Sequence, residues 1–269
     1  MSKLKNMITD LLDRMKGEQA HHRPARFIML MPGRTGSSYI IERMDSHPNI
    51  IAKGEIFGGG DVTEDISRVR RKLTSLYKKR YPGEILATGY KTKLYGNTSP
   101  VYADVPLFKK VISSEIGIDK CIILLRHNVV KQAVSRLRTE ALKKEMTQNN
   151  GSDKWNIRQE QDKVAKCRLP PADIDTWIRK YEKENNEIRA FGESLGVDTL
   201  VLYYEDLMLD PDSLMLSIFG FLDVPKVQTA STLIKHTNDD LSTMIENFDE
   251  LLENYRGTPY EEMFLSGAR

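Results

Sequence analysis

One loop constrains the fold of this 269-residue chain more than any other stretch: residues 32–38, with the sequence PGRTGSS. An apolar run precedes it at residues 26–31, and a segment of helical appearance follows at 39–44. A short buried strand, a turn rich in glycine and hydroxyl groups, and a helix start direct successive backbone N–H groups and the helix dipole at one point. We therefore predict that residues 32–38 hold a phosphate.

Apolar runs and helical stretches alternate along the rest of the chain. Further strands are expected at 86–94, 121–125 and 199–203, and further helices at 62–80, 100–116, 128–137, 173–195, 211–222 and 239–254. Residues 121–125 are wholly apolar, which is typical of a central parallel strand covered on both faces. The order predicts an α/β, P-loop-like, three-layer fold: a central, mainly parallel sheet flanked by helices, with binding groups at the carboxyl ends of the strands.

The chain is expected to form one main domain, residues 25–269, after an amphipathic N-terminal helix at 1–24. We favour docking of that helix on the body over pairing with a second subunit or contact with a membrane, because its apolar face is short. A homodimer is allowed by this helix but not required. Residues 143–170 are polar and end in two prolines, and they predict an irregular insertion that faces the substrate.

Composition narrows the classes of function. The net charge of +2, from 40 basic and 38 acidic residues, is too small to indicate a general nucleic-acid binder. Cys121 and Cys167 provide neither a disulfide framework nor the spacing of metal ligands. No apolar run approaches the length of a membrane span, and the N-terminus lacks the pattern of a signal peptide, so we expect a cytoplasmic protein.

A second set of polar residues follows the apolar strand at 121–125. Arg126 stands at its end, and Ser135 lies nine positions later on the expected helix. An arginine at a strand end can clamp a phosphate together with a serine hydroxyl on the next helix. Two anion sites at neighbouring strand ends suggest a nucleotide with phosphates on both sides of its ribose.

The loop departs from the Walker A pattern of ATP-binding proteins. That pattern requires a lysine directly after the last glycine, whereas here Arg34 precedes Gly36 and Ser37 follows it. An ordinary ATP-binding P-loop is therefore disfavoured. A P-loop kinase and a non-catalytic nucleotide-binding protein are kept as alternative functions.

The order of motifs resembles a known family. The segments PGRTGSSYI, SHPNI, GEIF, LLRHN, QAVS, YEDL and FLDV look like the sulfotransferases that use 3′-phosphoadenosine 5′-phosphosulfate (PAPS). Within that superfamily the chain is most similar to the bacterial carbohydrate sulfotransferases, which include trehalose 2-sulfotransferase and the nodulation-factor sulfotransferase. The resemblance spans residues 25–265 and extends to the ending NFDELLENYRGTPYEEMF.

The resemblance implies a cofactor site, residue by residue. The loop that holds the 5′-phosphosulfate is matched by Arg34, Thr35, Gly36, Ser37 and Ser38, and the 3′-phosphate clamp by Arg126 and Ser135. Many members have a proline where this chain has Asn128, with the serine one position closer to the arginine. This shift leaves open whether Arg126 or His127 faces the phosphate; we favour Arg126 for its permanent charge and bidentate fork.

The resemblance and the residues together imply in-line transfer of a sulfuryl group from PAPS to a hydroxyl of a carbohydrate or glycolipid, with 3′,5′-bisphosphoadenosine as product and no metal. The protein mainly positions the partners and stabilises charge on the leaving oxygen, a role that suits Arg34. Glu55 matches the acidic position after the His-Pro motif and is the predicted base. The alternative for Glu55 is a solvated surface glutamate.

Other residues are weaker candidates. Lys91 is expected either to contact the sulfuryl group or acceptor or to be a snorkelling edge lysine. Trp155 has an aromatic face suited to a sugar. Arg256 and Gly257 match basic C-terminal segments that close over the 3′-phosphate in the superfamily, although a solvated arginine is the default.

Two polar positions receive structural interpretations. His47 is expected to order the turn that it forms with Pro48 rather than to act as a base. Glu205 and Asp206 are explained as capping residues of the helix that they begin.

Overall fold

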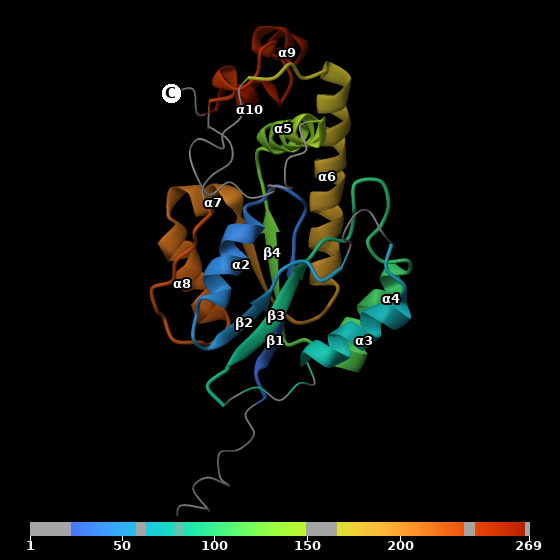
Figure 1. Ribbon diagram of the computed structural model, residues 1–269, viewed down its shortest axis with the longest axis vertical. Helices are drawn as coiled ribbons and strands as arrows, with labels where there is room; N and C mark the ends of the chain where they lie inside the picture. Colours follow the sequence, from blue (N-terminus) through green and yellow to red (C-terminus); the bar gives the residue numbers. More distant parts are fainter. Residues whose placement is uncertain are drawn as a thin grey trace, which may run out of the picture.

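The computed structural model describes residues 23–57, 63–77, 79, 81, 83–148, 166–233 and 240–266. Five parallel strands form one sheet in the order β2-β3-β1-β4-β5 (Figure 1). Their bounds are β1 Ala25–Leu30, β2 Ile50–Lys53, β3 Ala87–Thr92, β4 Lys120–Leu125 and β5 Asp198–Tyr203. The predicted α/β fold with a central parallel sheet is confirmed. The predicted N-terminal helix lies outside the described residues, apart from its last two positions.

Helices connect the strands and cover the sheet. They are α2 Ser37–Asp45, α3 Ile66–Tyr77, α4 Val105–Lys110, the π-helical turn η2 Val111–Ile116, α5 Val129–Gln148, α6 Pro171–Glu193, α7 Tyr204–Leu209, α8 Pro211–Phe221, the 3₁₀ turn η4 Leu241–Thr243, α9 Phe248–Asn254 and α10 Glu261–Leu265.

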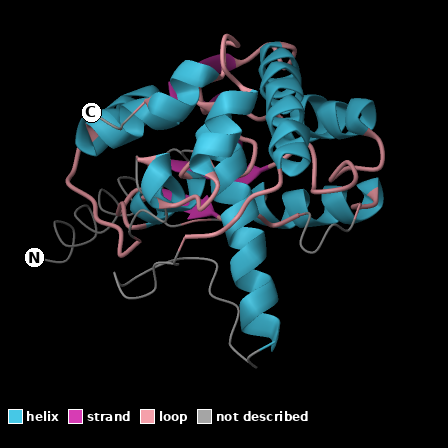
Figure 2. Cartoon of the chain, turned by 90° about the horizontal axis from the view of Figure 1, so that it is seen from above, coloured by secondary structure: helices cyan, strands magenta, loops and turns pink. Residues whose placement is uncertain are grey.

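The alternation of side chains along β1 divides the core into two layers. Ile28 and Leu30 pack with residues of α3, η2 and α6, whereas Phe27 and Met29 pack with residues of α2 and α8. All four are fully buried, because successive side chains of a strand point to opposite faces and both faces carry helices. Figure 2, the view from above, shows helices on both sides of the strands.

A third apolar cluster lies beyond the carboxyl ends of the strands, where α5, α6, α9 and α10 meet at the top of Figure 1. Two tyrosine hydroxyls tie the last segment to α6: Tyr255 donates to Asp175 at 2.5 Å and Tyr260 to Glu182 at 2.8 Å. The segment that carries Tyr255 and Tyr260 is thereby packed against α6.

Several expected helix bounds are wrong. The helix after β4 continues to Gln148, so the predicted insertion begins with helix, and residues 149–165 lie outside the described chain. The helix expected from 100 begins only at Val105, because Asp104 caps it by accepting from Leu107 N at 2.7 Å. The single helix expected at 239–254 is instead η4 and α9, separated by Asn247, whose amide makes two 3.0 Å bonds to the backbone of Leu169.

The order of the strands in the sheet brings the predicted binding residues together. The chain leaves β1 through α2 toward β2, and it leaves β4 through α5 and α6 toward β5 on the other side of the sheet. Adjacent β1 and β4 therefore form a topological switch point, where ligands of open α/β sheets bind beyond the strand carboxyl ends. The loop after β1 and Arg126 after β4 meet there.

Candidate active site

The loop after β1 has a backbone that depends on glycine. Gly36 has φ +76° and directly precedes α2, and Arg34 is also left-handed at φ +66°. A Cβ on Gly36 would lie 2.8 Å from Leu207 Cδ2 and 3.1 Å from Tyr204 Cδ2. Any larger residue at position 36 would therefore have to displace the side chains of Leu207 and Tyr204, and it would also strain the turn.

Three consecutive carbonyls of the loop are held by side chains. Pro32 O accepts from Thr35 Oγ1 (3.2 Å), Gly33 O from Gln132 Nε2 (2.6 Å) and Arg34 O from Arg126 Nη1 (3.3 Å). In a planar trans peptide the next N–H points away from the carbonyl, so the following three amides face away from these donors.

Among the described residues, the N–H groups of Gly33, Arg34, Thr35 and Gly36 have no acceptor. The first turn of α2 adds further unpaired N–H groups, since Gly36 offers no side-chain cap and the turn contains no acidic residue. The positive end of the helix dipole and these amides together could hold an anion.

The two groups of residues that were predicted to bind phosphate contact each other. Arg34 Nε donates to Ser135 Oγ at 3.0 Å, while Arg126 bonds to the Arg34 carbonyl. Arg126 is 4% exposed, and its guanidinium lies 4.2 Å from the centre of the Tyr204 ring. His127 is exposed and stacks on Tyr203, so Arg126 rather than His127 lies against the loop.

Positive charge accumulates at this point. Burial lowers the pKa of the Arg34 guanidinium; Tyr181 opposes this effect, and the cations Arg126 and Arg136 lower the pKa further. An arginine stays protonated at neutral pH despite such effects. The cluster is therefore a set of like charges that a bound anion would relieve.

Lys91 lies inside the site. The register of the sheet pairs it with Met29, next to the loop, and its side chain is 5% exposed on an interior strand. Its Nζ donates to Ser37 Oγ at 3.1 Å and Ser38 Oγ at 2.9 Å. Burial lowers the pKa of Lys91 to about 8, although nearby Glu55 opposes the shift. The alternative of a snorkelling edge lysine is wrong.

Glu55 faces two lysines. Its Oε2 lies 2.9 Å from Lys93 Nζ and its Oε1 lies 3.7 Å from Lys91 Nζ. Burial alone would raise the pKa of this carboxyl, but Lys93 and Lys91 outweigh it and hold the pKa below the usual value. Glu55 is thus an ionised, ion-paired group at neutral pH, with its side chain 33% exposed beside the loop.

The neighbours of Glu55 fix its place in the site. Phe57 is buried and packs edge-on against Tyr90 and Tyr102. Lys72 Nζ donates to Ile56 O at 2.7 Å. The segment after β2 is therefore held by the buried Phe57 ring and by the Lys72 bond to its backbone.

The remaining candidates are not tied to the loop by any contact within the described residues. Arg256 is exposed and pairs with Glu253 at 2.8 Å, and Gly257 occupies a left-handed turn before α10. Within the described chain, no hydrogen bond or ion pair joins either residue to the loop at 32–38 or to Arg126. Trp155 lies outside the described residues.

Sequence reasoning missed Gln132 and Lys93. Both had a signal: Gln132 begins the QAVS segment that ends at Ser135, and Lys93 shares a strand face with Lys91 because the two are two positions apart. The signal was weak because their partners, Gly33 and Glu55, are far away in the sequence.

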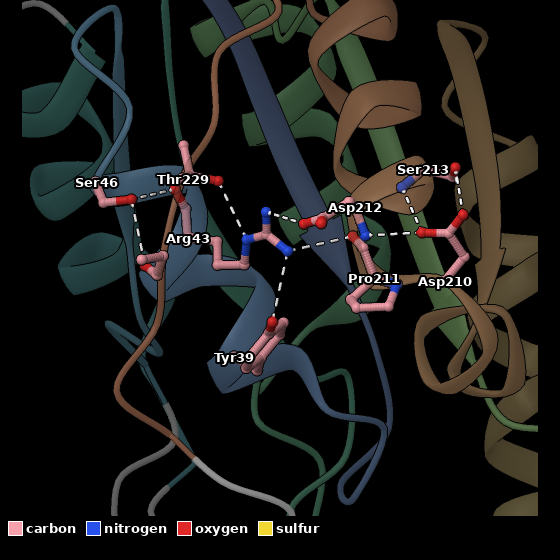
Figure 3. Close-up of polar contacts among 9 residues, drawn as sticks. Tyr39, Arg43, Ser46, Asp210, Pro211, Asp212, Ser213 and Thr229 are labelled. Carbon is pink, nitrogen blue, oxygen red and sulfur yellow. Dashed lines mark hydrogen bonds and ion pairs between the residues drawn. The ribbon is translucent and has the colours of Figure 1, made fainter.

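Arg43 was also missed, and it fixes α2, the helix at the anion site. This buried side chain donates to Asp212 Oδ1 at 2.7 Å and to Thr229 Oγ1 at 3.1 Å (Figure 3). Figure 3 also shows its bonds to Tyr39 and the Pro211 carbonyl, at 3.4 Å each. The network fastens the outer side of α2 to the start of α8.

Two structural interpretations have different outcomes. His47 is buried, its Nε2 lies 2.8 Å from Pro225 O and its Nδ1 accepts from Asn49 N at 3.0 Å, which agrees with an ordering role. Glu205 and Asp206 lie in the first turn of α7, as expected for capping residues. The Glu205 carboxylate, however, accepts from the N–H groups of His127 and Asn128, both at 3.1 Å, and so holds the backbone just before α5. The cap of α5 is Asn128, whose Oδ1 accepts from Lys131 N at 2.8 Å.

Two further properties concern the described residues as a whole. No group of three or more His, Cys, Asp or Glu side chains in the described ranges could hold a metal ion. No described helix has the length and apolar character needed to cross a membrane.

Comparison with known proteins gives relatives along nearly the whole chain. Nodulation protein H of Rhizobium tropici is 23% identical over 252 residues, which cover 90% of this chain and 93% of that protein. Two nodulation protein H sequences of Rhizobium meliloti are 23% and 24% identical, each over 90% of this chain and 95% of theirs. No protein-family model matches.

Among solved structures, a sulfotransferase from Alicyclobacillus acidocaldarius is similar with a TM-score of 0.44 and 17% identity, over 90% of this chain and 94% of that one. The match to nodulation protein H along both chains confirms the resemblance to the nodulation-factor group that the motifs predicted.

Proposed function

We infer that this chain, a member of the sulfotransferase superfamily related to nodulation protein H, transfers a sulfuryl group from PAPS to a hydroxyl of a carbohydrate or glycolipid. One observation carries the proposal: two anion-binding groups of residues interlock at the switch point of the sheet, directly beside an ionised carboxylate. A kinase would need a Walker lysine, which the loop lacks.

The residues present fit a nucleotide with phosphates at the 5′ and 3′ positions. The unpaired amides of residues 33–36 and the start of α2 suit a 5′-phosphosulfate, and Arg126 with Ser135 suits a 3′-phosphate. Bound there, PAPS supplies the sulfuryl group. The protein supplies orientation and charge.

Each side chain then has a definite task in our proposal. Arg34 and Lys91 stabilise the negative charge that develops on the oxygen between phosphorus and sulfur as its bond to sulfur breaks. Glu55 accepts the proton of the acceptor hydroxyl as the new oxygen–sulfur bond forms, leaving 3′,5′-bisphosphoadenosine. Lys93 holds Glu55 in place and keeps it ionised.

Calorimetric titration with 3′,5′-bisphosphoadenosine and with ATP tests the nucleotide. The wild-type chain is expected to prefer the bisphosphate, and Arg126→Ala to weaken its binding by at least ~10-fold, because a buried charge-assisted contact is lost. Preference for ATP would contradict the proposal. Unchanged affinity in Arg126→Ala would show that the 3′-phosphate lies elsewhere.

The Glu55→Gln variant separates an enzyme from a nucleotide-binding protein. Transfer of labelled sulfate from PAPS to saccharide acceptors should fall by ~10²–10⁴-fold while bisphosphate affinity is kept, since a general base acts on the chemical step. Glu115→Gln is the matched control, because this exposed glutamate pairs with Arg70 away from the site. Undiminished transfer by Glu55→Gln would exclude Glu55 as the base.

A further inference from the structure

We propose that Gln132 is a positioning residue: its amide sets the direction of the peptide between Gly33 and Arg34, and thereby aims the loop amides at the 5′-phosphate of the nucleotide. This inference rests on the proposed function. It concerns a side chain that the PAPS mechanism does not otherwise use.

The orientation of the Gln132 amide is fixed by its partner. The side chain is 0% exposed, and Nε2 lies 2.6 Å from the Gly33 carbonyl. The reverse orientation would place two acceptors face to face, so the hydrogen-bond partner assigns the nitrogen to this side. Consequently Oε1 points the other way, and it is buried without a hydrogen-bond partner among the described residues.

This arrangement adds little to folding by itself. Leaving a buried acceptor unsatisfied costs as much as, or more than, the net gain from one ordinary hydrogen bond. An apolar side chain of similar length would avoid that cost. The benefit of a glutamine at this position is therefore its hydrogen bond to the Gly33 carbonyl.

The Gly33 peptide has few other restraints. Glycine has wide conformational freedom, and even a Cβ at this position would meet only Tyr181 Oη at 3.6 Å and Lys93 Cε at 3.9 Å. If the peptide turned over, its carbonyl would face the anion and the Arg34 N–H would point away. Thr35 and Arg126 hold the carbonyls of Pro32 and Arg34, on either side of Gly33. Gln132 holds the middle one of these three consecutive carbonyls.

Gln132 also links the two parts of the site. It lies three positions before Ser135 on α5, and residues at this spacing share one helix face. Arg34, whose N–H depends on the Gly33 peptide, reaches Ser135 through its side chain. One face of α5 therefore restrains the backbone of Arg34 and binds its side chain.

Two ligands isolate the effect: 3′,5′-bisphosphoadenosine, and adenosine 3′-monophosphate, which lacks the 5′-phosphate. Gln132→Met should bind the bisphosphate ~10–100-fold more weakly and adenosine 3′-monophosphate with less than ~3-fold change. The KM for PAPS should rise, while the KM for the acceptor should stay the same. Gln132→Glu keeps the shape and loses the donor, and it should show the same selective loss.

Thr139→Val is the matched control. Thr139 is buried on the same helix and donates to Ser135 O at 2.8 Å within the helix, so its removal perturbs α5 without touching the loop. Both affinities should be unchanged in this variant.

Four outcomes would overturn the inference. Equal loss for both ligands, or loss that follows the fall in melting temperature, would make Gln132 a purely structural residue. If Gln132→Met bound the bisphosphate with wild-type affinity, Gln132 would have no role in positioning the loop. Failure of both variants to fold would contradict the small contribution to folding. Failure of the wild type to bind the bisphosphate would instead contradict the proposed function.

Discussion

At the scale of single residues, the site is defined by charged side chains that lie close together and share few partners of opposite charge. Lys91 is buried among two serine hydroxyls and Glu55, and burial lowers its pKa to about 8. Glu55, between Lys91 and Lys93, has a pKa below its usual value. In the proposed mechanism Glu55 is therefore a base that is ionised at neutral pH but weak, so its orientation toward the acceptor matters more than its proton affinity.

These shifts predict a one-sided pH profile. The charge on Lys91 is present below pH 8 and is lost as the pH rises through about 8, so kcat/KM for PAPS should fall on the alkaline side. Glu55 stays ionised down to acidic pH, so its titration should not change kcat/KM near neutral pH. Lys91→Arg, which keeps its charge, should lose the alkaline limb in steady-state rates; a limb unchanged in this variant would assign it to another group.

At the scale of elements, the anion site depends on how α2 is held. Its N-terminus supplies amides to the loop, and its outer side is fixed by Arg43, which reaches α8 through Asp212 and the segment after α8 through Thr229 (Figure 3). The guanidinium side is buried while Asp212 is largely exposed. The network therefore stabilises mainly by satisfying a buried arginine, not by an isolated surface ion pair.

Arg43→Ala should accordingly lower the free energy of unfolding by ~1–3 kcal/mol, because packing and several hydrogen bonds are lost together. Lys53→Ala, which breaks the exposed 3.6 Å pair between Lys53 and Asp45, should change it by less than ~0.5 kcal/mol. Chemical denaturation of both variants gives the comparison. Equal effects would show that the Arg43 network does not hold α2.

At the scale of the whole molecule, the C-terminal segment completes the support of the site. Phe264 is 1% exposed in the cluster formed with α5 and α6, and Asn128, at the start of α5, donates to the Met263 carbonyl and Ser266 Oγ, both at 2.8 Å. Because α5 carries Gln132 and Ser135, α10 supports the proposed nucleotide site.

Phe264→Ala should therefore lower the free energy of unfolding by ~3–5 kcal/mol and weaken 3′,5′-bisphosphoadenosine binding, because a large buried side chain is removed beneath α5. Leu265→Ala is the control: its side chain is 43% exposed, and both quantities should stay close to those of the wild type. Thermal melts with and without the bisphosphate measure both effects. Full affinity in Phe264→Ala would show that α5 keeps its position without α10.

The local elements of this protein follow from residue patterns along the chain. An apolar strand followed by a glycine-rich turn and a helix has few possible structures, and an apolar run ending at Arg126 places that arginine at a strand end. The α/β class, the glycine turn between β1 and α2, and the place of Arg126 directly after β4 were therefore predictable. Helix bounds were less so, because caps such as Asp104 and interruptions such as Asn247 depend on partners elsewhere.

Which of these groups meet depends on how the elements pack together. The strand order puts β3 beside β1 and thus Lys91 beside the start of α2, and it puts β4 on the other side, so that Arg126 reaches the Arg34 carbonyl. Gln132 and Gly33 are 99 positions apart, and Arg34 and Ser135 are 101 apart. Residue patterns encode local backbone preferences, whereas contacts across such distances follow from the packing of whole elements, and the interlocked loop exists only there.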